Sequence, residues 1–283
     1  MPKVKVNGIN LYYEEYGQGE PLIFIPGLGG TTKLFFFQIP FFKEHFRVIT
    51  FDNRGAGETD KPLGFYTMKM MAKDLNGLLD HLNIDEPIHL AGASMGGIIA
   101  QAFIKDYRER VKTLSLICSG VSGGDPHQTK SSDEILQKIL NPGNTREEKI
   151  DTFLENFYYH KYVEQNPSLK DILLNLKIKP QPTYAYMSQL YACMDNRPYY
   201  EWLKEIDIPT LVMHGRQDLI WPLQNALTLK KGIGENCELS IIEEAGHMFF
   251  SEKPDEFNHI LFEFLSQNKE IDFAGKPKET CTI

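Results

Sequence analysis

Short apolar runs alternate with helix-type segments through residues 1–120 of the chain. Residues 21–26, 46–51 and 111–118 form runs of strand length, of the kind that is buried on both faces of a parallel sheet. Residues 68–82 instead carry apolar side chains at helical spacing. Strands that alternate with helices in this way predict an α/β fold in which most of the sheet is parallel.

The two ends of this pattern complete the predicted sheet. Asn7-Gly8 lies between alternating residues and is the strongest short signal for a β-hairpin, so we expect an antiparallel edge at the start of the chain. Strand-type runs return at residues 208–214 and 238–242, and an amphipathic helix follows at residues 254–267. Together these elements predict a sheet of about eight strands with helices on both faces.

Residues 121–206 interrupt the alternation of strands and helices. This segment lacks buried-strand runs, contains many helix formers and aromatic side chains, and is broken by prolines. We expect it to be a helical lid inserted into a core that comprises residues 1–120 and 207–268. Residues 269–283 are predicted to be a polar C-terminal tail.

The composition narrows the class of protein. The 283 residues carry a formal net charge of -8 and no run of Lys and Arg, which argues against a nucleic-acid partner. No apolar segment has the length of a signal-peptide core or a membrane span, so we expect a cytoplasmic protein without a membrane partner. The four cysteines are scattered without a paired spacing, which predicts neither a disulfide framework nor a metal site.

The junction of a predicted strand and helix carries a G-x-S-x-G motif, Gly92-Ala93-Ser94-Met95-Gly96. Where a strand turns at once into a helix, the residue at the apex is strained and its side chain is exposed, which singles out Ser94. The N-terminus of the helix behind it would stabilise an anion. The alternative interpretation is that Ser94 only caps the helix, as serine commonly does.

Asp218 and His247 follow two later strands, and residues beyond the carboxyl ends of parallel strands converge on one crevice. A serine hydroxyl needs an imidazole to take its proton, and the imidazole needs a carboxylate to fix its tautomer. Ser94, His247 and Asp218 are therefore the predicted nucleophile, base and acid. Asp125, which follows the preceding strand, is the competing candidate for the acid.

A tetrahedral anion at Ser94 would need two backbone donors, predicted to be the N–H groups of Leu28 and Met95. The glycine turn that contains Leu28 also allows a rival interpretation as a dinucleotide-binding loop. The third glycine of G-x-G-x-x-G would fall on Thr32, however, so this match fails. We expect no cofactor and no metal.

The chain resembles the α/β-hydrolase superfamily, most closely its lidded esterase, enol-lactonase and cofactor-free haloperoxidase-like branch. Pro26 and Glu58-Thr59 depart from the pattern that many relatives share. The resemblance implies a serine hydrolase that cleaves a carboxylic ester or related acyl compound through an acyl-Ser94 intermediate. It leaves open a carbon–carbon lyase, an acyltransferase, a perhydrolase or a slow-turnover ligand-binding receptor on the same fold. The matching segments, in order, are residues 26–30, 52–57, 92–97, 215–218 and 245–247.

Apolar side chains follow two of the predicted site loops. Phe35, Phe36 and Phe37 come after the Leu28 turn, and Trp221 comes after Asp218. A pocket of such residues would favour an uncharged, apolar small-molecule ester, because burying an unpaired charge is costly. The sequence holds no signal for the oligomeric state.

Overall fold

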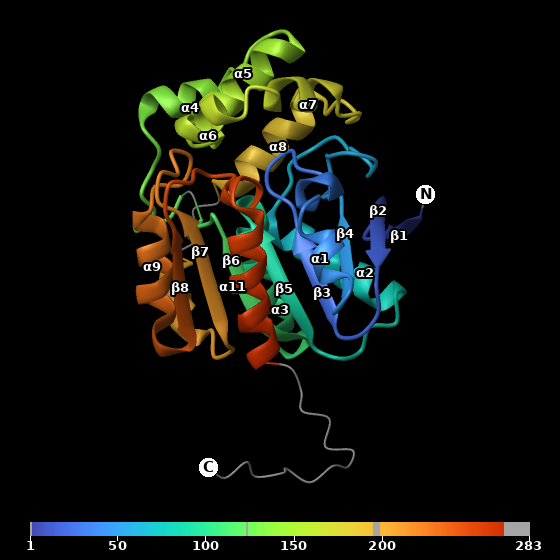
Figure 1. The fold of residues 1–283 in the computed structure, drawn as a ribbon. Helices are drawn as coiled ribbons and strands as arrows, with labels where there is room; N and C mark the ends of the chain where they lie inside the picture. The colour runs from blue at the N-terminus through green and yellow to red at the C-terminus, as the bar shows by residue number, and fades with distance from the viewer. Residues whose placement is uncertain (1, 123, 195–198, 269–283) are drawn as a thin grey trace.

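The computed structural model describes residues 2–122, 124–194 and 199–268, and the predicted tail at residues 269–283 lies outside these ranges. Its centre is an eight-stranded sheet in the order β1-β2-β4-β3-β5-β6-β7-β8. Strands β3 to β8 run parallel, and β1 and β2 form the antiparallel edge. The predicted α/β architecture is therefore confirmed (Figure 1).

The strands lie close to where the apolar runs predicted them. The hairpin turns at Asn7 and Gly8, which both have positive φ angles, 44° and 81°, as a tight two-residue turn requires. The strands are β1 Lys3–Val6, β2 Ile9–Tyr16, β3 Pro21–Ile25, β4 Arg47–Phe51, β5 Ile88–Ala93, β6 Val111–Ile117, β7 Thr210–Gly215 and β8 Cys237–Ile242.

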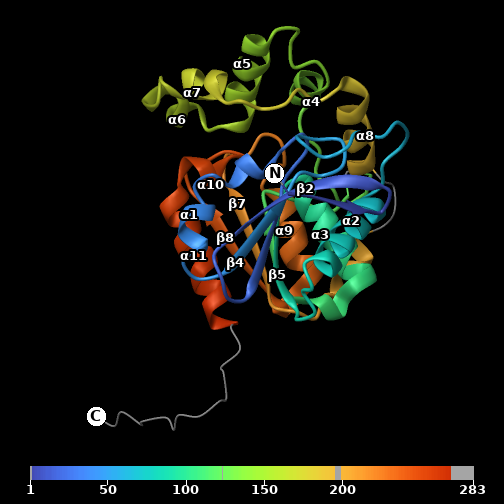
Figure 2. The same cartoon turned by 90° about the vertical axis from the view of Figure 1, so that its right-hand side faces the viewer.

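Helices cover both faces of the sheet. Side chains of α2 (Met68–His81), α3 (Met95–Tyr107) and α9 (Gln224–Ile233) belong to one apolar cluster. Side chains of α1 (Ile39–Phe42), α10 (Phe249–Glu252) and α11 (Pro254–Gln267) belong to a second cluster on the opposite face. Figure 2 shows these two sets of helices on either side of the twisted sheet.

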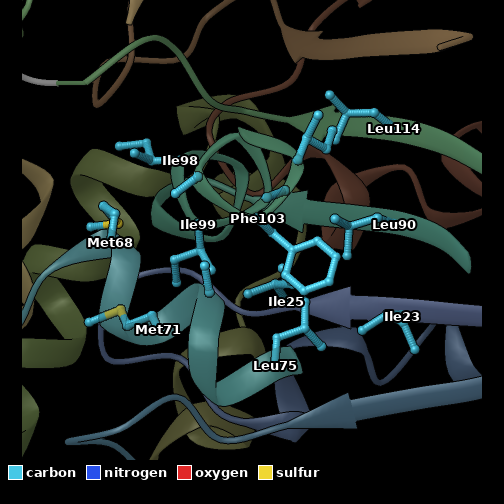
Figure 3. Close-up of a cluster of buried hydrophobic side chains, with 14 of the residues drawn as sticks. Ile23, Ile25, Met68, Met71, Leu75, Leu90, Ile98, Ile99, Phe103 and Leu114 are labelled. Carbon is cyan, nitrogen blue, oxygen red and sulfur yellow. The ribbon is translucent and has the colours of Figure 1, made fainter. Parts of the chain in front are cut away.

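The first cluster shows how apolar side chains at helical spacing hold α3, the helix that follows Ser94, in place. Ile99 and Phe103 of α3 point toward Leu75 of α2 and toward Ile25 and Leu90 of the central strands (Figure 3). All of these side chains are 1% exposed or less. Burial of each is worth about 1.5–3 kcal/mol, so α3 is held firmly against the strand that precedes it.

The segment between β3 and β4 forms two short helices and not one continuous helix. The structure has a 3-10 helix at Thr32–Phe35 and a separate short helix α1, with Pro40 in its first turn. Thr31 caps the 3-10 helix, and proline is favoured where a new helix begins because its missing N–H needs no partner there. The other 3-10 helices are Arg108–Arg110, Tyr200–Glu205 and Gly234–Asn236.

The segment between β6 and β7 forms helices rather than strands in its described part, and we call it the helical insertion. It lies over the carboxyl ends of the parallel strands (Figures 1 and 2). None of the helices in the described ranges has the length and apolar character that crossing a membrane requires. The helices of the insertion are α4 Asp133–Leu140, α5 Arg146–Phe157, α6 His160–Gln165, α7 Leu169–Asn175 and α8 Thr183–Cys193.

A buried ion pair holds the loop after β4 against α2. The guanidinium of Arg54 donates to both carboxylate oxygens of Asp74, with a 2.6 Å bond from Nε to Oδ2. Both side chains are 4% exposed or less. Asn7 also donates to Asp74 at 2.8 Å, so the pair ties the hairpin to the same point.

We predict that Asp74→Ala lowers the free energy of unfolding by about 3–5 kcal/mol, because it leaves the Arg54 guanidinium buried without its counter-ion. Urea denaturation would measure this loss. Asp106→Ala is the matched control, since its ion pair with Lys69 lies at the surface. The control should change stability by less than about 1 kcal/mol. Equal effects of the two substitutions would contradict the prediction.

Candidate functional site

Ser94 occupies the sharp turn between β5 and α3. Its φ and ψ angles are 55° and -118°, a conformation that non-glycine residues rarely adopt. Its side chain makes no capping hydrogen bond to α3, so the interpretation of Ser94 as a helix cap is wrong. The Ser94 N–H donates to Ile117 O at 2.8 Å, and Ser119 Oγ donates to Ser94 O at 2.8 Å. These two bonds fix the strained backbone on both sides.

The glycines on either side of Ser94 are required by crowding, as the motif predicted. A Cβ at Gly92 would lie 2.3 Å from the carbonyl oxygen of Gly96. A Cβ at Gly96 would lie 2.2 Å from the carbonyl oxygen of Ile25. Only residues without a side chain let β5, α3 and β3 approach this closely.

Asp218 and His247 meet beyond the ends of β7 and β8. His247 Nδ1 lies 2.7 Å from Asp218 Oδ2, and both side chains are buried. The other oxygen, Oδ1, accepts the backbone N–H groups of Ile220 at 2.8 Å and Trp221 at 2.9 Å. Because an ionised carboxylate only accepts hydrogen bonds, His247 Nδ1 carries the proton and Nε2 is left as the basic nitrogen.

The electrostatics of this pair favour a charged imidazole. Burial by itself lowers the pKa of His247, but the Asp218 carboxylate beside it outweighs burial and raises this pKa well above 6.5. A second histidine, His214, places Nε2 at 3.3 Å from Asp218 Oδ2 and at 2.6 Å from Trp221 O. Burial lowers the pKa of His214, so His214 stays neutral and the carboxylate is left to pair with His247.

Cys118, which the sequence did not single out, lies between Ser94 and His247. Its thiol is beside the His247 ring and the Ser94 backbone, and it is 1% exposed. Burial raises the pKa of this thiol, which keeps it neutral. The Ser94 hydroxyl makes no hydrogen bond to any residue in the described ranges, so Ser94 and His247 are not hydrogen-bonded in this structure. A usable signal for Cys118 was its position directly after β6, the strand next to β5.

The two predicted oxyanion donors lie on the two segments that flank Ser94. Met95 begins α3, where the first N–H groups have no partner within the helix. Leu28 follows Gly27, at which an added Cβ would lie 3.2 Å from Ser94 Cβ. In the part of the chain that the structure describes, the N–H groups of Leu28 and Met95 have no hydrogen-bond acceptor. Both are therefore available to an anion at Ser94.

Gln189 of α8 supports the Leu28 turn, and sequence analysis missed it. Its Oε1 accepts the Gly29 N–H at 3.0 Å, and its Nε2 donates to Arg54 O at 2.8 Å. The side chain is 0% exposed. One amide from the insertion thus fixes two loops that follow β3 and β4. Its separation of 160 residues from Gly29 left no local signal.

Asp125, the competing candidate for the acid, is engaged elsewhere. Its Oδ1 accepts from the backbone N–H of His127 at 2.8 Å and lies 3.0 Å from His127 Nδ1. Its Oδ2 accepts the Tyr200 N–H at 3.0 Å. Asp125 therefore joins the two ends of the insertion, while Asp218 is the carboxylate that contacts His247.

The three phenylalanines after the Leu28 turn do not gather at the site, contrary to the prediction. Phe35 is fully buried and stacks on Phe24 in the second apolar cluster. Phe36 and Phe37 are 69% and 45% exposed. Phe35 ends the 3-10 helix Thr32–Phe35, and Phe36 and Phe37 lie beyond it. The aromatic ring beside the site comes instead from Phe157 of α5, whose edge faces His247 at 5.4 Å between ring centroids.

A separate cleft of about 470 Å³ opens on the insertion and contains none of the candidate site residues. It gathers several charged side chains at the surface, but the described residues include no group of three or more His, Cys, Asp or Glu that could hold a metal ion. The cleft therefore does not replace the Ser94 site. Its lining residues are Asp151, Leu154, Glu155, His160, Val163, Glu164, Pro167 and Lys170.

Comparisons with known proteins identify the family of this fold. The family model described as alpha/beta hydrolase fold matches residues 20–254. The AB hydrolase superfamily protein YisY of Bacillus subtilis is 31% identical, with 90% of this chain and 95% of that protein covered. A 2-hydroxy-6-oxononadienedioate/2-hydroxy-6-oxononatrienedioate hydrolase of Pseudomonas putida is 30% identical, with 91% and 92% covered. The structure of a thermophilic esterase from Thermogutta terrifontis superposes with a TM-score of 0.81 at 25% identity, covering 95% of this chain and all of that one.

We predict that an NMR titration of the His247 imidazole gives a pKa above 6.5 and that Asp218→Asn lowers this pKa. The substitution removes the negative charge that stabilises the imidazolium, whereas burial, which disfavours it, remains. Asp125→Asn is the control and should leave the His247 titration unchanged, since Asp125 contacts His127 and Tyr200. A shift of the titration in Asp125→Asn but not in Asp218→Asn would show that the acid is misassigned.

Proposed function

This chain belongs to the α/β-hydrolase family, and on that basis we propose that it is a serine hydrolase that cleaves a carboxylic ester or related acyl compound. The observation that carries the proposal is the meeting of three groups at the carboxyl ends of β5, β7 and β8. These groups are the strained Ser94, Asp218 and His247. A 2.7 Å bond joins Asp218 to His247. A half-buried serine at the start of a helix, at the same edge of the sheet as a histidine paired with a carboxylate, is suited to attack on a carbonyl carbon.

In the proposed reaction Ser94 Oγ attacks the acyl carbon, and His247 Nε2 takes the hydroxyl proton. Asp218 stabilises the resulting imidazolium through the bond to Nδ1. The N–H groups of Leu28 and Met95 donate to the oxyanion of the tetrahedral intermediate. His247 then returns the proton to the leaving alcohol, and a water molecule hydrolyses acyl-Ser94 with the same base.

We further propose that the helical insertion, residues 121–206, acts as a lid on a core of residues 1–120 and 207–268. Two contacts support this division of the chain. Gln189 of the insertion binds the loop that carries Leu28, and Phe157 of the insertion faces His247. The insertion thereby excludes water from both halves of the site, which strengthens the electrostatic interactions within it.

A second candidate is hydrolysis of a 2-hydroxy-6-oxo dienoic acid, which the name of the Pseudomonas putida relative supports. Such a substrate carries carboxylate groups that need a cation in the site. Arg54, which lies on a neighbouring loop, has its guanidinium occupied by Asp74. We therefore favour the uncharged ester. Parallel assays of p-nitrophenyl butyrate and a 2-hydroxy-6-oxo dienoate would decide, since faster turnover of the dienoate would reverse this order.

Ser94→Ala should abolish labelling by a fluorophosphonate probe and lower ester turnover by roughly 10⁴-fold or more, because the triad acts as a unit. Gel fluorescence and a p-nitrophenyl ester assay measure the two effects, and circular dichroism checks the fold. Ser168→Ala, which changes an exposed serine of the insertion, should leave both readouts unchanged. Labelling that persists in Ser94→Ala would refute the assignment of the nucleophile.

Esters with acyl chains of about four to eight carbons should exceed acetate in kcat/KM, because each buried methylene is worth about 0.8 kcal/mol. A series of p-nitrophenyl esters measures the slope. Phe157→Ala should flatten the series, since its ring lies against His247, whereas Phe36→Ala, at a side chain that is 69% exposed, should not. A series that is flat or falls from acetate upward in the wild-type protein would point to a small or polar substrate.

A further inference from the structure

Glu252 is a buried carboxylate that the proposed reaction does not use. It ends α10, five positions after His247, and is 6% exposed. Its oxygens accept the Gly246 N–H at 3.0 Å and 3.2 Å. Its Oε2 also accepts the Tyr159 N–H of the helical insertion at 3.2 Å. One side chain therefore binds the residue before His247 and the residue that directly precedes α6.

The same two segments touch at further points around Glu252. The Met248 N–H donates to Phe157 O at 2.9 Å, and the Phe157 ring faces the His247 ring edge-on at an interplanar angle of 77°. Gly246 has no space for a side chain, since a Cβ there would lie 2.8 Å from Tyr159 N and 2.9 Å from Phe157 O. The backbone of residues 157–159 is thus packed directly onto the loop that carries His247.

We propose that Glu252 is a positioning residue that clamps residues 157–159 of the insertion to the His247 loop. The orientation of the imidazole and the seating of the insertion then depend on one carboxylate. This inference rests on the proposed function, because it assigns Glu252 a role in keeping His247 aligned with Ser94. Glu252 itself has no contact with the reacting atoms in this scheme.

A carboxylate suits this place because two separate N–H donors converge on it. Ionised Glu252 accepts both donors, whereas a glutamine would keep one acceptor and turn an NH2 donor toward a backbone N–H. A hydrogen bond to a charged acceptor is also stronger than one to a neutral acceptor. The bonds from the Tyr159 and Gly246 N–H groups therefore offset part of the cost of burying this charge.

The protonation of Glu252 makes the clamp depend on pH. Burial raises the pKa of Glu252 to about 7, although the N–H groups of Tyr159 and Gly246 lower it. The titratable groups that face it are Asp218 and His247, with Tyr158 and Tyr162 from the insertion side. Because burial outweighs these bonds, the site holds the protonated carboxyl more tightly than the ionised one, so ionisation weakens the clamp as the pH rises through about 7.

The first test compares Glu252→Gln with Glu256→Gln, which makes the same chemical change at an exposed position in the first turn of α11. Glu252→Gln should lower kcat about tenfold or more, the cost of one hydrogen bond to a charged group, with a smaller change in KM. The pH profile of kcat/KM should carry a second transition near pH 7 in the wild type, from the ionisation of Glu252, and should lack it in Glu252→Gln. Glu256→Gln should keep the wild-type profile.

The second test removes only the N–H donor of the insertion. Tyr159 has φ and ψ angles of -69° and 129°, which proline adopts without strain, and Tyr158 before it is extended, as proline requires. Tyr159→Pro should therefore lower kcat well below the value for Tyr159→Ala, which loses the ring but keeps the N–H. Equal kinetics for Tyr159→Pro and Tyr159→Ala would overturn the clamp.

Amide hydrogen exchange tests the clamp without relying on activity. After correction for intrinsic rates, peptides that span residues 157–160 and 244–248 should lose protection in the wild type as the pH rises through 7. Glu252→Gln should remove this dependence and Glu256→Gln should keep it. Protection that is identical in the wild type and Glu252→Gln would overturn the proposal even if Ser94 reacts with the fluorophosphonate. If Ser94 does not react, the proposed function fails, and the exchange data still decide whether the clamp exists.

Discussion

The strained turn at Ser94 is the constraint on which the rest of the site depends. A non-glycine residue with a φ angle of 55° costs about 1–3 kcal/mol and persists only where its surroundings hold it in place. Here β5 enters the turn from the centre of the sheet, and α3 leaves it packed against α2. The Ile117 carbonyl and the Ser119 hydroxyl bind the apex from β6 and the loop after it. The apolar core thus fixes the position of the polar side chain.

Asp218 and His247 are arranged by a second constraint, the limited number of acceptors on one carboxylate. Asp218 gives one oxygen to the backbone of its own turn and the other to His247. The backbone bonds set the direction of the carboxylate independently of the histidine. His214 closes the same turn by binding Trp221 O, and because it stays neutral, the Asp218 carboxylate remains free to stabilise the protonated form of His247.

The sequence predicted those features that depend on neighbouring residues. The hairpin at Asn7-Gly8, the parallel strands and the crowded glycines around Ser94 all follow from local steric rules or from hydrophobic period. The order of strands then brought Ser94, Asp218 and His247 to one edge of the sheet.

The remaining features depend on contacts between distant segments and were missed or wrong. Cys118, Gln189 and Glu252 bind partners that adjacent sequence does not specify. The directions of Phe35, Phe36 and Phe37 depended on the end of the 3-10 helix Thr32–Phe35, which includes only the first of them. Helical period alone could not separate that turn from one long helix interrupted at Pro40.

The bond from Gln189 to Gly29 bears on how proteins of this architecture can diversify. The part of the insertion that contains α4 to α7 contacts the His247 loop mainly through residues 157–159. Helix α8 instead binds the turn after β3, which contains Leu28 and Gly29. In a recombination between homologues, α8 would therefore need to come from the same parent as the core, whereas the helices before it would not. An exchange of insertions between homologues would therefore preserve the Leu28 turn when the crossover falls before Thr183, and would separate that turn from its support when the crossover falls after Cys193.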